Sequence, residues 1–421
     1  MSTALRRRKV ALRASALLSA FFLLASPGSI SSALAQESVI FTFFGARGAA
    51  PVGPLAVGDD GSLYGTTLGG GANGTTGTVF RLTPPVPPAT NWKETVLYSF
   101  AAPKDGYNPP GGVIFGPDGA LYGTTWFGGS YDSGTIFKLS PPPEGQTAWK
   151  ETVLHSFQAR SAGTIFFASI IFGPDDAIYG TTSNGGASDG GTVFKLAPPT
   201  APATNWNFTT LHAFRGSPDG VYPTGGIIFG PDGALYGTTQ RGGSGNGQGM
   251  VFKLTPPQTP GANWLINDLY SFSYTGPAGD PCAAPGALAL SPGGAIYGRI
   301  GGGCSVFRLN PPLSPGAKYT ITKFAPNFGN GANDPILFDR HGAIYITIGQ
   351  QGRTGCGEVL KVLPPVNQPN VFTIYSFAGG PNDGCGPRGG IVFGKDGALY
   401  GTTYYGGAKN GLGSGVAYRI Q

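Results

Sequence analysis

Five aspartates carry the strongest chemical signal in this 421-residue sequence, because each lies in a loop that leads into a new repeat of the chain. They are Asp105, Asp219, Asp280, Asp334 and Asp383. If the repeats close into a ring, five carboxylates approach the mouth of its central channel and could bind a cation such as calcium, or a polyol. The alternative is that each carboxylate accepts hydrogen bonds from nearby backbone N–H groups in a turn. We favour the local role, because most of these aspartates are followed by glycine as in turns. The first and third repeats lack the aspartate, which also weakens the case for a symmetric site.

Four side chains in neighbouring loops form a second candidate binding group. Trp126, Arg241, Tyr404 and Tyr405 follow a recurring Thr-Thr pair, and their identities vary while the residues around them repeat. Loops on a rigid scaffold commonly carry binding function, and exposed aromatic rings near aspartate or asparagine suit sugar rings. The alternative is drift at solvated positions, and the sequence does not separate the two.

The four cysteines, Cys282, Cys304, Cys356 and Cys385, all lie in the fifth to seventh repeats. Four cysteines allow three pairings, and disulfides are expected in an exported protein. We favour Cys282–Cys304 within the fifth repeat and Cys356–Cys385 between the sixth and the seventh. Each bond would close a loop of about 20 to 30 residues and stabilise the fold by roughly 3 kcal/mol.

Signatures of an enzyme are weak. The histidines, His155, His212 and His341, lie apart from any recognisable nucleophile motif. The sequence has no cysteine and histidine spacing typical of zinc, no phosphate-binding glycine loop with its lysine, and no G-x-S-x-G motif. A pair of carboxylates of the glycosidase type remains open. We expect no catalytic residues and no cofactor other than calcium, and we leave enzyme activity uncertain.

A ten-residue phrase must position all these candidates. It reads Gly-Pro-Asp-Gly-Ala-Leu-Tyr-Gly-Thr-Thr over residues 116–125, around Tyr122. Near-copies are centred on Tyr64, Tyr179, Tyr236, Tyr297, Tyr345 and Tyr400. The successive tyrosines are 58, 57, 57, 61, 48 and 55 residues apart. A period of this size indicates stacked supersecondary units.

Each repeat contains four short segments typical of β-strands, separated by Gly- and Pro-rich turns. In the second repeat they are residues 112–115, 120–125, 134–139 and 151–157. Four antiparallel strands per period predict an all-β fold, a seven-bladed β-propeller. Residues 39–43 at the start are predicted to complete the last blade beside residues 416–420, which removes two free sheet edges. We call the top face the rim that carries the second-to-third and fourth-to-first connections.

Residues 1–35 are predicted to be a signal peptide, which leaves residues 36–421 as one propeller domain. The segment has a basic start at residues 6–9, an apolar stretch too short to span a bilayer, and an Ala-Leu-Ala cleavage motif at residues 33–35. Five of the 27 basic residues lie in it, so 22 remain against 21 acidic residues. This balance argues against nucleic acid as a partner. We expect a monomer that is secreted or periplasmic and has no membrane anchor.

The repeats resemble the GloVer-type tandem repeats of secreted bacterial proteins over residues 39–420. The resemblance rests on the phrase F-G-P-D-G-x-L-Y-G-T-T, the following G-G, and G-T-V-F-K-L. It implies an exported repeat protein and brings no catalytic residue.

Together these features predict an exported, non-catalytic binding or scaffolding propeller. Its top-face loops would contact a glycan, a cell-surface polymer or a protein. One alternative is a propeller-type hydrolase or lyase acting on extracellular polysaccharide, and another is a structural component of a surface layer or matrix.

Overall fold

The computed structural model describes residues 36–421, apart from residues 102, 159–168, 245–246, 260, 274–284, 302–305, 315–316, 325–333, 350–353, 364–369 and 408–413. These residues belong to one compact unit, Ala35–Gln421. The predicted signal peptide lies outside the described residues. No helix in the described part of the chain is long and apolar enough to cross a membrane.

The strands form seven antiparallel sheets of four strands each, which we number as blades 1 to 7. Blade 1 contains β2 (Ala56–Val57), β3 (Leu63–Thr67), β4 (Thr78–Thr83) and β5 (Lys93–Ser99). Blade 2 contains β6 (Val113–Phe115), β7 (Leu121–Thr125), β8 (Thr135–Ser140) and β9 (Lys150–Ser156). Blade 3 contains β10 (Ile171–Phe172), β11 (Ile178–Thr182), β12 (Thr192–Ala197) and β13 (Asn207–Ala213). Blade 4 contains β14 (Ile227–Phe229), β15 (Leu235–Thr239), β16 (Met250–Thr255) and β17 (Leu265–Ser271). Blade 5 contains β18 (Pro285–Leu290), β19 (Ile296–Ile300), β20 (Val306–Asn310) and β21 (Thr320–Phe324). Blade 6 contains β22 (Leu337–Phe338), β23 (Ile344–Ile348), β24 (Glu358–Leu363) and β25 (Asn370–Ser376). Blade 7 contains β26 (Gly384–Phe393), β27 (Leu399–Gly406), β28 (Val416–Ile420) and β1 (Glu37–Thr42).

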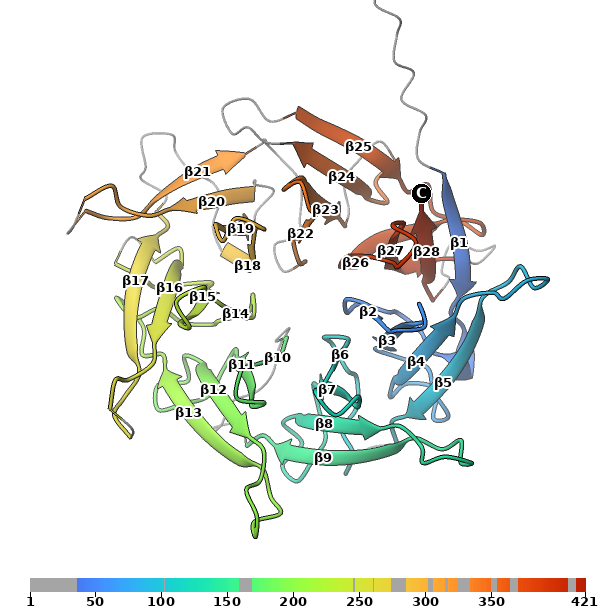
Figure 1. Ribbon diagram of the computed structural model, residues 1–421, viewed down its shortest axis with the longest axis horizontal. Helices are drawn as coiled ribbons and strands as arrows, with labels where there is room; N and C mark the ends of the chain where they lie inside the picture. Colours follow the sequence, from blue (N-terminus) through green and yellow to red (C-terminus); the bar gives the residue numbers. More distant parts are fainter. Residues whose placement is uncertain are drawn as a thin grey trace, which may run out of the picture. The chain divides into compact units, whose positions relative to one another are not determined.

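The sheets surround a common centre as the blades of a seven-bladed β-propeller, which confirms the predicted fold (Figure 1). The first strand of each blade lies nearest the centre, and the fourth lies at the periphery. The fold contains no α-helix in its described part, and a single turn of 3-10 helix, η1 (Gly45–Arg47), follows β1.

Strand β1 completes blade 7, as the sequence predicted. It pairs antiparallel with β28, from Glu37 opposite Ile420 to Thr42 opposite Val416 (Figure 1). A register shift between Val39 and Phe41 matches the shifts between the third and fourth strands of most other blades. The last blade is therefore built like its neighbours, although its outer strand comes from the other end of the chain.

Aromatic rings packed between the blades form the core. The second strand of blade 2 is fully buried, and a Cβ on its Gly123 would lie 2.6 Å from the ring of Phe137 in β8. Glycine is needed at this place in the repeated Tyr-Gly-Thr-Thr because any side chain would displace that ring. Phe137 in turn meets Phe100 of blade 1, with ring centroids 5.2 Å apart.

The Asp-Gly turns between the first and second strands lie at the rim opposite the top face. In blade 2 the Asp118 carboxylate accepts a hydrogen bond from the Tyr122 hydroxyl at 3.1 Å and lies 2.5 Å from the Lys138 ammonium. Although burial opposes it, hydrogen bonds and the charge of Lys138 keep the pKa of Asp118 below its ordinary value. The corresponding ion pairs in other blades are Arg81–Asp60, Lys195–Asp175, Lys253–Asp232, Lys361–Asp339 and Arg419–Asp396.

Candidate functional site

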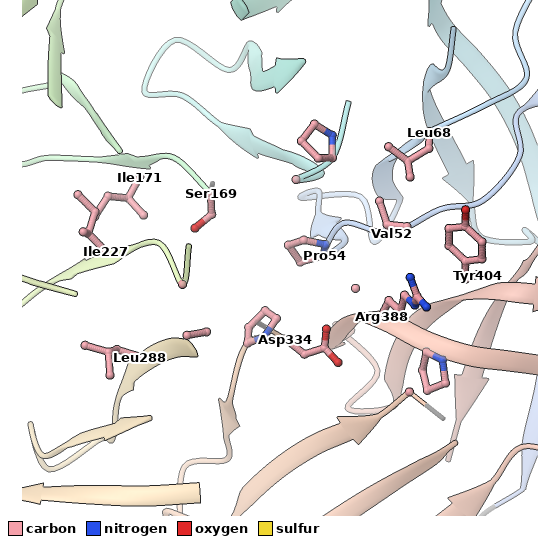
Figure 2. Close-up of a pocket in the computed structure, with 18 of the residues that line it drawn as sticks. Val52, Pro54, Leu68, Ser169, Ile171, Ile227, Leu288, Asp334, Arg388 and Tyr404 are labelled. Carbon is pink, nitrogen blue, oxygen red and sulfur yellow. The ribbon is translucent and has the colours of Figure 1, made fainter. Parts of the chain in front are cut away.

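A cavity of about 530 Å³ lies where the innermost strands of the seven blades converge (Figure 2). Each blade contributes residues from the segment that leads into its first strand or from that strand itself. The lining is mostly aliphatic side chains, prolines and glycine backbone. Among the described lining residues, only Asp334 and Arg388 are charged, and both belong to blades 6 and 7.

The loop after the second strand supplies a second layer of lining residues. Its first residue lines the cavity in blades 1, 2 and 6, which places Trp126 there, and the equivalent residue of blade 7, Tyr404, lines the cavity from within β27. The following residue pairs instead with the loop that enters the same blade, as Phe127 does with Tyr107. Successive side chains of an extended chain point to opposite sides, so one position faces the centre and the next faces away from it.

Arg241 and Tyr405 occupy that second position. The backbone of Arg241 pairs with Val221, and its guanidinium lies 6.0 Å from the centroid of the Tyr222 ring. Tyr405 pairs with Cys385 in the sheet of blade 7. Of the four variable residues singled out in the sequence, the structure therefore brings Trp126 and Tyr404 to the cavity, whereas Arg241 pairs with the loop entering blade 4 and Tyr405 pairs with β26.

Three of the candidate aspartates have a common local role. The Asp105 carboxylate accepts hydrogen bonds from the backbone N–H of Ala101 at 3.0 Å and from the Tyr98 hydroxyl at 2.6 Å. The equivalent partners are Arg215 and His212 for Asp219, and Ala378 and Tyr375 for Asp383. These carboxylates fix the corner between one blade and the next, and none of them lines the cavity. Asp280 lies outside the described residues.

Asp334 differs from the other aspartates, and its position in the repeat explains why. It lies 11 residues before its repeat tyrosine, Tyr345, whereas the other four aspartates lie 17 residues before theirs. It therefore stands where Gly111 stands in blade 2, directly at the cavity (Figure 2). The sequence contained this signal, but grouping the five aspartates by loop alone missed it.

The Asp334 carboxylate is held in the wall between blades 5 and 6. Its side chain is only 9% exposed and accepts a hydrogen bond from the Thr347 hydroxyl at 3.0 Å. Arg299 approaches to 4.0 Å, but its guanidinium donates to the backbone carbonyl of Thr347 at 2.9 Å. Burial raises the pKa of Asp334 to about 7, because Arg299, Thr347 and Arg388 only partly offset the loss of hydration.

Arg388 is the main site residue that the sequence interpretation missed. It is exposed, lines the cavity, and its guanidinium lies 4.9 Å from the centroid of the Tyr404 ring. No carboxylate in the described part of the chain forms an ion pair with it within 4.0 Å. The signal for Arg388 in the sequence was a replacement within the repeat: residues 387–390 read Pro-Arg-Gly-Gly, whereas the equivalent residues 109–112 of blade 2 read Pro-Pro-Gly-Gly.

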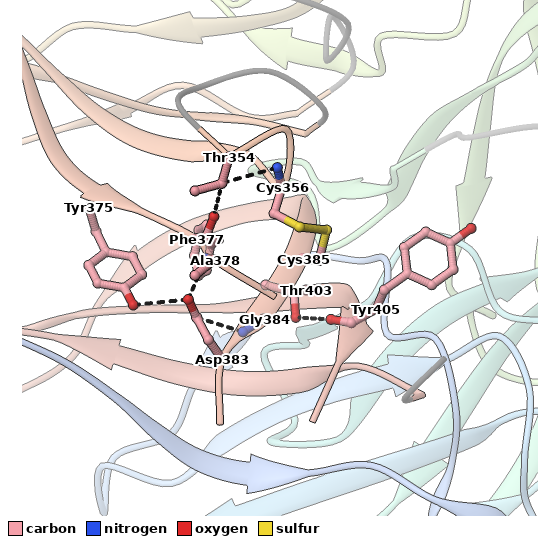
Figure 3. Close-up of a disulfide and its surroundings, with 10 residues drawn as sticks. All are labelled: Thr354, Cys356, Tyr375, Phe377, Ala378, Asp383, Gly384, Cys385, Thr403 and Tyr405. Carbon is pink, nitrogen blue, oxygen red and sulfur yellow. Dashed lines mark hydrogen bonds between the residues drawn. A yellow bond between two sulfur atoms is a disulfide. The ribbon is translucent and has the colours of Figure 1, made fainter. Parts of the chain in front are cut away.

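A disulfide braces the segment that carries Arg388. Cys356, in the loop after the second strand of blade 6, is bonded to Cys385 in the first strand of blade 7, which confirms that predicted pair (Figure 3). The carboxylate of Asp383 accepts hydrogen bonds from Tyr375 and Ala378 beside the disulfide. The predicted Cys282–Cys304 pair lies outside the described residues. Among the described residues, no three His, Cys, Asp or Glu side chains cluster as metal ligands, and calcium binding stays a prediction.

Solved structures of similar fold include propellers with unrelated descriptions. One is described as the extracellular domain of a hybrid two component system from B. thetaiotaomicron: 13% identity, TM-score 0.55, covering 91% of this chain and 42% of that chain. Another is virginiamycin B lyase from Staphylococcus aureus: 15% identity, TM-score 0.52, covering 92% and 98%. At these identities the likeness concerns the fold alone.

No curated protein sequence matches this chain. The model of the Gloeobacter/Verrucomicrobia repeat matches residues 29–201 and 87–305, which together make up most of the chain. The chain therefore belongs to the Gloeobacter/Verrucomicrobia repeat family.

Proposed function

We propose that this protein is an exported, non-catalytic binding protein that takes its ligand into the central cavity from the top face. The observation that carries the proposal is the cavity itself: about 530 Å³, mostly apolar, and lined from all seven blades. Ligand sites in proteins commonly have roughly 300 to 1,000 Å³ and a few polar groups that fix orientation. Asp334 and Arg388 supply such groups on one side.

The rim of the cavity supports a role for the top-face loops. Trp126 and Tyr404 line the cavity from the top-face segments, and their rings offer flat apolar surfaces to a ligand. The end of a glycan, a cell-surface polymer or a segment of a protein would bind there, with the rest of the molecule outside. The rigid sheets hold these loops in place, so binding needs little ordering of the chain.

Export is part of the proposal. The signal peptide predicted at residues 1–35 and the Cys356–Cys385 disulfide both fit a secreted or periplasmic protein. The mature chain would be residues 36–421, one propeller acting as a monomer.

A cavity-filling variant tests the proposal. The mature chain is screened by thermal shift and calorimetry against glycans, envelope fractions and small organic molecules, with and without calcium. Val52 lines the cavity and is half-buried, so Val52→Trp should abolish binding of any ligand found in the screen. The control is Val86→Trp, because Val86 is 74% exposed and lies between β4 and β5, outside the cavity. Binding that survives Val52→Trp would place the ligand site elsewhere.

A polysaccharide hydrolase or lyase is the second candidate, because Asp334 has the properties of a general acid. Its carboxyl lies in the cavity, and burial raises its pKa to about 7, in the range useful for proton transfer near neutral pH. Turnover of extracellular polysaccharides should then fall at least roughly a hundredfold in Asp334→Asn and persist in Asp219→Asn, which alters a corner aspartate. No turnover by the unaltered chain, or equal turnover in both variants, would count against this candidate.

A further inference from the structure

The two sides of the cavity differ in chemistry. Ile171, Ile227 and Leu288 of blades 3 to 5 line one side, and Arg388 and Tyr404 of blade 7 line the other (Figure 2). The described lining residues of blades 3 to 5 include one polar side chain, that of Ser169. A ligand hydroxyl buried against this aliphatic side would lose its hydrogen bonds to water without replacement. This side is therefore suited to an apolar part of a ligand.

The opposite side is suited to an anion. The Arg388 guanidinium is exposed, and the Tyr404 ring at 4.9 Å supports it by a cation–π contact. A guanidinium presents N–H groups in a planar fork that matches a carboxylate. Asp334 leaves this fork available, because its carboxylate accepts a hydrogen bond from Thr347 at 3.0 Å and lies 4.0 Å from Arg299.

The charges at the cavity favour a singly charged anion. Arg388 and Asp334 are the only charged residues among the described lining residues. Arg388 provides one positive charge, which balances one negative charge on a ligand. A carboxylate meets this condition better than a phosphate dianion.

We propose that the ligand is an amphipathic carboxylic acid, with its carboxylate on Arg388 and its apolar body against Ile171, Ile227 and Leu288. The proposal rests on the central cavity being the ligand site and specifies what enters it. When the ligand is a polymer or a protein, the part that enters the cavity has this chemistry.

Matched acid and amide probes test the proposal. The mature chain is titrated by calorimetry and ligand-observed NMR at millimolar concentration with 4-phenylbutanoate and decanoate, and with the corresponding amides. The acids should bind roughly tenfold or more tightly than the amides, as expected for a hydrogen-bonded charge pair. Arg388→Gln should remove this preference, and Arg388→Lys should retain part of it.

The control variant is Arg215→Gln, because Arg215 is an exposed arginine of the loop entering blade 4 that does not line the cavity. It should leave the acid preference unchanged, and thermal unfolding of each variant verifies that the fold is intact. Equal binding of acids and amides, no binding of either acid, or an acid preference that survives Arg388→Gln would each overturn the proposal. If a neutral glycan then binds in a manner sensitive to Val52→Trp, the central site stands and only the ligand class fails. If no ligand of any class is sensitive to Val52→Trp, both fail.

Discussion

At the scale of single residues, buried glutamates at the blade junctions make the stability of the fold depend on pH. Glu151 of β9 lies near the corner that Asp105 and Tyr98 form, and its Oε1 is buried without a hydrogen-bond partner. Burial first, and the Asp105 charge second, raise the pKa of Glu151 to about 7. Glu37 of β1 repeats this arrangement beside Asp383, with its pKa also raised to about 7 by burial and that charge. The propeller therefore binds protons at these junctions that an unfolded chain would release.

This arrangement predicts a loss of stability as the pH rises. The pKa of Glu151 is about 7 in the fold and 4.5 when unperturbed, so its contribution is complete below about pH 4.5 and is lost as the pH rises through about 7. Glu151→Gln should remove this loss and raise the free energy of unfolding at pH 8 by on the order of 1 kcal/mol, after discounting for solvent screening.

Chemical denaturation of both proteins between pH 4.5 and pH 8 measures the effect of Glu151→Gln. The matched control is Glu144→Gln, since Glu144 is an exposed residue in the loop before the same strand. Parallel pH profiles for the unaltered chain and Glu151→Gln would show that Glu151 is ionised without cost in the fold.

At the scale of strands and loops, the repeat predicted most of what the structure contains. The second, third and fourth strands of blade 2 were expected at 120–125, 134–139 and 151–157, and they lie at Leu121–Thr125, Thr135–Ser140 and Lys150–Ser156. These strands combine alternating or continuous apolar residues, and Gly or Pro bounds the second and third strands, so their pattern is clear. The first strand of blade 2 was expected at 112–115 and lies at Val113–Phe115.

The candidate site was predicted less well than the strands, because it depends on single positions within loops. Trp126 and Tyr404 were found because the frame around them repeats and they vary. Arg388 was missed because it replaces a proline, one residue in a Pro- and Gly-rich segment. Asp334 was selected for its loop, but only its spacing from Tyr345 shows that it faces the centre. Successive side chains of an extended segment point to opposite sides, so a shift of one residue moves a side chain from the cavity to the rim.

At the scale of the whole molecule, the ring depends on a strand that joins the two ends of the chain. Phe43, directly after β1, is 1% exposed, and its ring centroid lies 4.8 Å from that of Phe80 in blade 1. Closure of blade 7 and packing of blade 7 on blade 1 thus use the same segment. An open ring would expose the edge of β28 and loosen the cavity, whose lining needs all seven blades in place.

Removing this segment should therefore damage the molecule more than an equivalent local defect does. Phe43→Ala and Phe100→Ala remove equivalent rings and should each cost about 3 to 5 kcal/mol, because both rings are fully buried between blades. A chain that begins at Phe44 should lose more than Phe43→Ala, because it also loses the β1–β28 ladder. Thermal unfolding and light scattering should show a lower Tm and self-association through the free edge of β28, and a synthetic peptide of residues 36–43 added in trans should restore the Tm. A shortened chain that stays monomeric with an unchanged Tm would show that the ring closes without this strand.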